Sequence, residues 1–143
     1  MSFANKHTDH SSCHCYDGLP HYLKRAREAS LISDHPQHKL GAVIMQKNKV
    51  IAAGFNYLHK THPAIRTIGK NEDKTLHAEM VCILKIKNKD ILRGATIAVY
   101  RQKKNGSFGM SRPCPVCYKF LRYYGIKKVI YTTDSGGIEE EII

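Results

Sequence analysis

The sequence contains no apolar run long enough to cross a membrane. Its longest runs, such as GAVIM at residues 41–45, fall far short of the ~20 residues that a transmembrane helix needs. The polar, histidine-rich N-terminus does not have the pattern of a signal peptide. Five cysteines, two of them spaced as metal ligands, argue against a disulfide framework and fit a reducing compartment. We therefore expect a cytoplasmic protein that does not bind membranes.

Acidic residues are scarce, because 12 Asp and Glu stand against 23 Lys and Arg and leave a formal net charge of +11. Such a charge could hold a nucleic-acid backbone, or only the phosphate of a mononucleotide. The basic residues are scattered along the chain in small groups rather than massed in one segment. We expect most of them to coat solvated faces, and a polynucleotide groove built from some of them is the alternative.

A length of 143 residues with 42% hydrophobic content allows one domain with one core. Residues 1–17 are polar and show no apolar period, so we interpret them as a tail that precedes a domain over residues 18–143. The sharper alternative is a second, structural zinc site formed by Cys13, His14, Cys15 and His21. The C-x-C spacing is tighter than that of most zinc sites, which favours the tail.

Hydrophobic periodicity predicts an alternation of helices and short strands. Helices are expected over residues 19–32, 76–88 and 114–124, and strands over 40–45, 50–55, 95–101 and 128–133. A four-residue linker makes the first two strands an antiparallel hairpin, and the helix before strand 95–101 favours a parallel neighbour for it. Residues after 133 allow a turn and one short strand, which must pair antiparallel with the strand before it.

Two short motifs carry the residues that could bind a metal. His77 and Glu79 are one residue apart at the expected start of a helix, and Cys114 and Cys117 open a later one. Thiols at i and i+3 lie on one face of a helical turn, so they can hold one zinc ion together with His77. Three protein ligands leave a fourth position for a water, whose pKa zinc lowers to about 7. Glu79 then suits the role of proton carrier.

A closed, structural zinc site is the alternative, and it needs a fourth protein ligand. Cys82 and His62 are the nearest candidates. Cys82 lies five residues after His77, roughly 140° further round the helix at about 100° per residue. We therefore expect Cys82 to face the core as a small hydrophobic residue rather than to bind the metal.

The combination H-x-E followed by P-C-x-x-C is the signature of zinc nucleobase deaminases. Residues 39–133 resemble the cytidine and deoxycytidylate deaminase superfamily, and KTHP at residues 60–63 and SRP at residues 111–113 are similar to its phage and viral members. The resemblance implies a three-layer α/β/α sandwich with a five-stranded mixed sheet. It also implies one catalytic Zn²⁺ and the hydrolytic deamination of cytosine in a free nucleoside or nucleotide, with release of ammonia. We also expect a homo-oligomer.

The resemblance further implies three substrate contacts, Asn56, Ala78 and His62. Asn56 follows the second strand directly, as in the Gly-x-Asn that ends this strand in the family, and its amide would hydrogen-bond a sugar. The alternative for Asn56 is a plain turn residue, since Asn is favoured where strands end. A loop histidine such as His62 has the corresponding alternative of facing solvent.

The short C-terminal end departs from deoxycytidylate and tRNA-adenosine deaminases, whose last two strands are joined by a helix and run parallel. It resembles free cytidine deaminases and bacterial toxin deaminases, although free cytidine deaminases usually have cysteine at the position of His77. Two rival functions remain at this point. One is a deaminase acting on cytosine in single-stranded DNA or RNA, and the other is a zinc-stabilised binding module without catalysis.

Overall fold

The computed structural model describes residues 18–57 and 76–143. Its centre is a five-stranded sheet in the order β2-β1-β3-β4-β5. The strands are β1 (Lys39–Gln46), β2 (Lys49–Phe55), β3 (Thr96–Gln102), β4 (Lys128–Thr132) and β5 (Ile138–Ile142). β3 and β4 are parallel, and the other neighbouring pairs are antiparallel. The predicted mixed sheet with an antiparallel last pair is confirmed.

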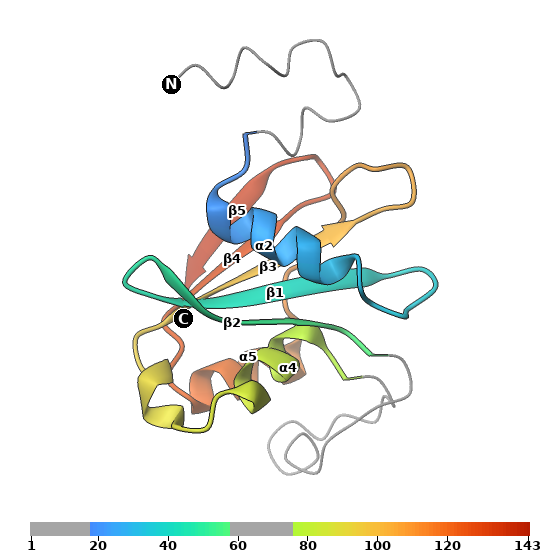
Figure 1. Cartoon of the computed structure of the whole chain (residues 1–143). Helices are drawn as coiled ribbons and strands as arrows, with labels where there is room; N and C mark the ends of the chain where they lie inside the picture. The colour runs from blue at the N-terminus through green and yellow to red at the C-terminus, as the bar shows by residue number, and fades with distance from the viewer. Residues whose placement is uncertain (1–17, 58–75) are drawn as a thin grey trace.

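Helices cover both faces of the sheet, with α2 on one side and α4 and α5 on the other (Figure 1). These elements are α2 (His21–Ser30), α4 (Ala78–Lys85) and α5 (Pro115–Tyr123), and a 3-10 turn, η3 (Lys89–Leu92), follows α4. The predicted three-layer α/β/α sandwich is confirmed. Across residues 18–57 and 76–143, no helix is long and apolar enough to span a membrane.

β1 is buried on both faces because helices cover both sides of the sheet at this strand, α2 on one side and α4 and α5 on the other. Ala42 and Ile44 point into the core beneath α4 and α5, whereas Val43 and Met45 point into the core beneath α2. This alternation follows from the two-residue period of a strand. It gives the protein two hydrophobic cores, one on each side of the sheet.

The parallel neighbour expected for β3 is confirmed on one of its two sides. β3 is parallel to β4 but antiparallel to β1. The tight hairpin keeps β1 beside β2, so the connection from β2 through α4 passes over β1 before the chain returns as β3. β2 and β3 therefore run in the same direction without being neighbours.

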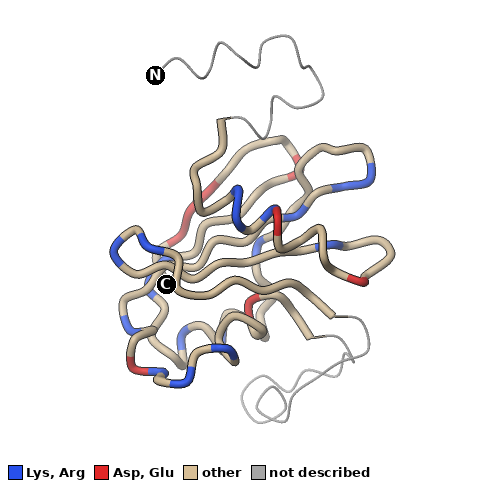
Figure 2. Tube along the Cα trace, viewed as in Figure 1, with Lys and Arg blue, Asp and Glu red and all other residues tan. Residues whose placement is uncertain are grey.

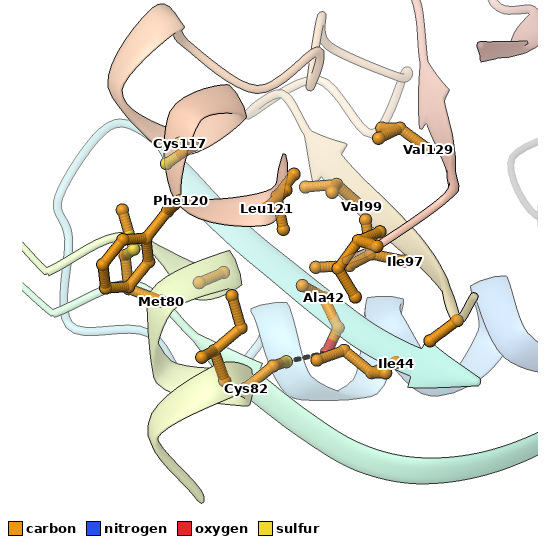
Figure 3. Packing of buried hydrophobic residues seen from close by; sticks show 14 of the residues in the cluster. Ala42, Ile44, Met80, Cys82, Ile97, Val99, Cys117, Phe120, Leu121 and Val129 are labelled. Carbon is orange, nitrogen blue, oxygen red and sulfur yellow. Dashed lines mark hydrogen bonds between the residues drawn. The ribbon is translucent and has the colours of Figure 1, made fainter. Parts of the chain in front are cut away.

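Cys82 belongs to the larger core (Figure 3). It is fully buried, and its thiol donates a hydrogen bond of 3.1 Å to the carbonyl oxygen of Ala42. Burial raises the pKa of this thiol. The expectation that Cys82 faces the core is confirmed.

Gly41, in β1, lies directly beneath α2. A Cβ at this position would come within 1.9 Å of Ala26 O and 2.6 Å of Ser30 N, so Gly41→Ala must push the helix away from the sheet. We expect the free energy of unfolding to fall by about 1–3 kcal/mol, the usual cost of overpacking, in a urea titration. Gly18→Ala is the matched control, because a Cβ there meets nothing within 4 Å. Equal unfolding free energies for the two variants would contradict this packing.

Candidate active site

Two helix N-termini meet at one place in the structure. His77 is the N-cap residue of α4, and Cys114 is the N-cap residue of α5. Both have extended backbone conformations, and their carbonyl oxygens accept the first helical hydrogen bonds, from Val81 N and Tyr118 N. Cys117 follows in the first turn of α5. Both helices begin later than the apolar pattern predicted. The residues His77 and Cys114, which the pattern placed inside the helices, are their N-caps.

The three candidate ligands lie within bonding range of one metal ion. Nδ1 of His77 is 3.2 Å from Cys117 Sγ and 3.7 Å from Cys114 Sγ. Bond lengths at tetrahedral zinc would place neighbouring ligand atoms about 3.5–3.8 Å apart, so the donor set and the spacing both fit zinc. In the part of the chain that the structure describes, His77, Cys114 and Cys117 are the one group that could hold a metal.

The alternative of a closed, structural zinc site loses one of its two candidates for a fourth ligand. Cys82 is absent from the metal-binding group, and its thiol is hydrogen-bonded to the backbone of β1. His62 lies outside the described residues. Three ligands therefore meet without a fourth among residues 18–57 and 76–143, and this number of ligands fits the open site predicted from the sequence.

The two thiols differ in their proton affinity. The hydrogen bond from Cys117 lowers the pKa of the Cys114 thiol to about 4. The same hydrogen bond, together with burial, raises the pKa of Cys117. Both thiols must be deprotonated to bind zinc, so metal binding releases a proton from Cys117.

Glu79 is the buried carboxylate of the site. It lies in the first turn of α4 and has 3% of its surface exposed. Burial raises the pKa of Glu79, while the charge of His77 and a hydrogen bond with the Cys117 thiol act in the opposite direction. A carboxyl group with a raised pKa beside a metal site is suited to taking up and giving back a proton.

A pocket with a volume of about 250 Å³ opens beside these residues. Its lining residues come from the α2–β1 loop, β1, the end of β2, and the starts of α4 and α5. They are His35, His38, Leu40, Asn56, His77, Ala78, Glu79, Arg112 and Cys114. The structure thus brings Asn56 and Ala78, both expected to contact substrate, to the same cavity as Glu79.

Asn56 is also a structural anchor for the loop before β1. Its Oδ1 accepts hydrogen bonds from Ser33 Oγ at 2.6 Å and Leu40 N at 3.0 Å, and its Nδ2 donates to His38 O at 2.6 Å. A side-chain amide offers two acceptor positions and two N–H groups. Among the described residues, one N–H of Asn56 is left for a ligand. Asn56 is therefore more than a plain turn residue.

Sequence reasoning missed His35 and His38. Nδ1 of His35 accepts the backbone N–H groups of Gln37 and His38, and Nδ1 of His38 lies 2.7 Å from Arg101 Nη2. Acceptance at Nδ1 places the ring hydrogen of each neutral imidazole on Nε2. Partial burial and then the charge of Arg101 lower the pKa of His38. No spacing motif in the sequence identifies these histidines, since the other residues of the pocket and Arg101 come from distant parts of the chain.

Several expected site residues are not brought together. His62 lies in residues 58–75, and Cys13, His14 and Cys15 lie in residues 1–17, both outside the described residues. His21 is exposed at the start of α2 and belongs to no metal-binding group within the described ranges. The second zinc site stays a prediction.

The family description "Cytidine and deoxycytidylate deaminase zinc-binding region" matches residues 19–133. The chain belongs to this family, which the fold and the three converging metal ligands also support. The family binds zinc, and His77, Cys114 and Cys117 are positioned to bind it here. A search of curated proteins found no match.

Solved structures of two deaminases are similar to this chain. The dCMP deaminase of cyanophage S-TIM5 in its apo form is 26% identical, with 78% of this chain and 79% of that chain covered and a TM-score of 0.55. Its complex with dCMP and dUMP gives 25% identity, 78% of each chain and a TM-score of 0.57. The cytidine deaminase of Burkholderia pseudomallei shares the fold at 17% identity, with coverages of 87% and 93% and a TM-score of 0.61.

Replacing any one of His77, Cys114 and Cys117 with Ala should remove zinc and stability together, because zinc binding is coupled to folding. Metal analysis of the purified variants and thermal unfolding measure the two effects. Cys82→Ala is the control: it leaves a cavity in the core but should retain zinc. A ligand variant that binds one zinc per chain as tightly as the unaltered protein would exclude that residue as a ligand.

Proposed function

We propose that this protein catalyses the hydrolytic deamination of cytosine in a free nucleoside or nucleotide. The observation that carries the proposal is a buried carboxylate, Glu79, beside three converging metal-ligand atoms at a pocket. A structural zinc site has no use for such a carboxylate, whereas hydrolysis needs a group that moves protons.

His77, Cys114 and Cys117 would hold zinc, which when bound supplies a Lewis acid that lowers the pKa of water. Glu79 takes a proton from the attacking water and passes it to the ring nitrogen of cytosine. The oxygen of this water adds at the ring carbon that bears the amine. Glu79 then takes the proton of the new hydroxyl group and delivers it to the amine, and the carbon–nitrogen bond breaks to release ammonia and leave a carbonyl group on the ring. Burial raises the pKa of Glu79, which helps it to hold the proton between these transfers.

The remaining lining residues supply hydrogen-bond donors for the substrate. Ala78 is the first residue of α4 after the cap, where a backbone N–H has no partner within the helix, and it is suited to an oxygen of the base. The remaining N–H of Asn56 is suited to a sugar hydroxyl. His35 and His38 line the same pocket and carry donor hydrogens on Nε2.

A small substrate fits the site better than a polynucleotide. The cavity of about 250 Å³ is near the lower end of the roughly 300–1,000 Å³ typical of small-molecule sites. Lys and Arg are distributed over the described part of the chain rather than gathered along one track (Figure 2). The cyanophage relative was solved with mononucleotides. A substrate role for His62, a homo-oligomeric state and a cytoplasmic location stay predictions.

Glu79→Gln should retain zinc and the fold but lose at least about 10²- to 10⁴-fold in kcat, because it removes the proton carrier and no metal ligand. Ammonia release and zinc content measured on the same preparation separate catalysis from metal binding. Glu140→Gln, on the exposed strand β5, is the control. Normal turnover by Glu79→Gln would show that the mechanism is wrong.

The choice of substrate is tested with cytidine, deoxycytidine, their monophosphates and a cytosine-bearing single-stranded oligonucleotide. We expect ammonia release from at least one of the mononucleosides or mononucleotides. Activity on the oligonucleotide alone, with binding that weakens steeply with salt as counterion release demands, would favour the nucleic-acid function instead. A zinc-loaded protein that deaminates none of them would favour the binding module.

A further inference from the structure

Glu141, near the C-terminus, accepts four hydrogen bonds from three side chains. Its Oε2 accepts from Arg112 Nε at 2.8 Å and from the Tyr131 hydroxyl at 2.9 Å. Its Oε1 accepts from Arg112 Nη2 at 3.1 Å and from the Tyr118 hydroxyl at 2.5 Å. Each carboxylate oxygen thus receives one guanidinium N–H and one tyrosine O–H. The contacts lower the pKa of Glu141 to about 2, so the group is charged at neutral pH.

The antiparallel pairing of β5 places this carboxylate near the active site. Glu141 lies opposite Val129 of β4, two positions along from the pair of Glu139 and Tyr131. Residues two apart on a strand share a face, and Val129 and Tyr131 belong to the core beneath α4 and α5. Glu141 therefore points to the side of the sheet where α5, with Tyr118, and the metal ligands lie.

The network holds Arg112, which precedes the ligand Cys114 by two residues and lines the same pocket as Glu79. Two of its three guanidinium nitrogens are bound to Glu141, and its guanidinium carbon lies 4.8 Å from the centre of the Tyr118 ring. Within the described residues, Nη1 makes no hydrogen bond. A bidentate pair of this kind fixes the orientation of the guanidinium and leaves Nη1 as the donor for a ligand.

The charge of the pair limits the kind of ligand. Glu141 compensates the positive charge of Arg112, so the guanidinium offers oriented N–H donors with little net attraction for an anion. A phosphate near Arg112 would also lie near the Glu141 carboxylate, which repels it. A carbonyl or hydroxyl oxygen of the base or sugar suits these donors better.

We propose that Glu141 is a positioning residue that acts through Arg112, holding its guanidinium so that it donates to an uncharged oxygen of the bound nucleoside. This proposal rests on the proposed function of the same pocket. It makes β5 part of the substrate site, although the other two acidic residues of this strand, Glu139 and Glu140, are exposed.

A double-mutant cycle tests the proposal with Arg112→Ala, Glu141→Ala and the variant carrying both. We expect KM for the preferred substrate to rise about tenfold in each single variant, the usual effect of losing a hydrogen bond to a charged group. The double variant should be no worse than Arg112→Ala, because Glu141 acts through Arg112. Zinc content should be unchanged, and kcat should change less than KM. The matched control is Glu140→Ala, which lies on β5 like Glu141 and breaks an ion pair with Lys128 of β4.

Three results would overturn the proposal. The effects of the single variants could add in the double variant, Glu141→Ala could behave like Glu140→Ala, or Arg112→Ala could impair monophosphates while sparing nucleosides. Calorimetric binding of uridine and deoxyuridine, the expected product nucleosides, to the same zinc-loaded proteins supplies a readout without turnover. If the unaltered protein binds them but does not deaminate, the proposed function fails and the binding cycle still decides the role of Glu141. If it binds neither these nucleosides nor their monophosphates and deaminates none of the substrates, both fail.

Discussion

The candidate site depends on strand direction, because β2 and β3 both run antiparallel to β1. Their carboxyl ends therefore lie at the same edge of the sheet, and the helices α4 and α5 that follow them begin there. The N-cap and first turn of α4 supply His77 and Glu79, and those of α5 supply Cys114 and Cys117. Helix N-termini favour negative charge. The same geometry thus gathers the ligands, and the helix N-termini act against the burial that raises the pKa values of Glu79 and Cys117.

The rest of the pocket is assembled by hydrogen bonds between distant segments. Asn56, at the end of β2, holds the loop between α2 and β1 through Ser33, His38 and Leu40. That loop supplies His35 and His38, two of the three histidines that line the pocket. The site is therefore sensitive to how α2 packs on the sheet, since α2 leads directly into the loop.

Much of the metal centre could be predicted from the sequence because its spacings are local. Cys114 and Cys117 lie three residues apart, and His77 and Glu79 two apart, so helix geometry alone determines which of them share a face. The burial of Cys82 was predicted from the same helix geometry. Helix ends were less predictable, because the apolar period does not distinguish a cap residue from the first residue of the helix.

The sequence by itself determined the metal-binding residue types and the order of helices and strands. It also determined the antiparallel pairing of the last two strands, because a short turn cannot connect parallel strands. Only the tertiary structure decided the neighbours of β3, the place of His35 and His38 at the pocket, and the network around Arg112 and Glu141. The deciding contacts join residues 23, 29 and 63 positions apart. Such contacts depend on strand order and register, which arise from the packing of the whole sheet and leave no periodic trace in the chain.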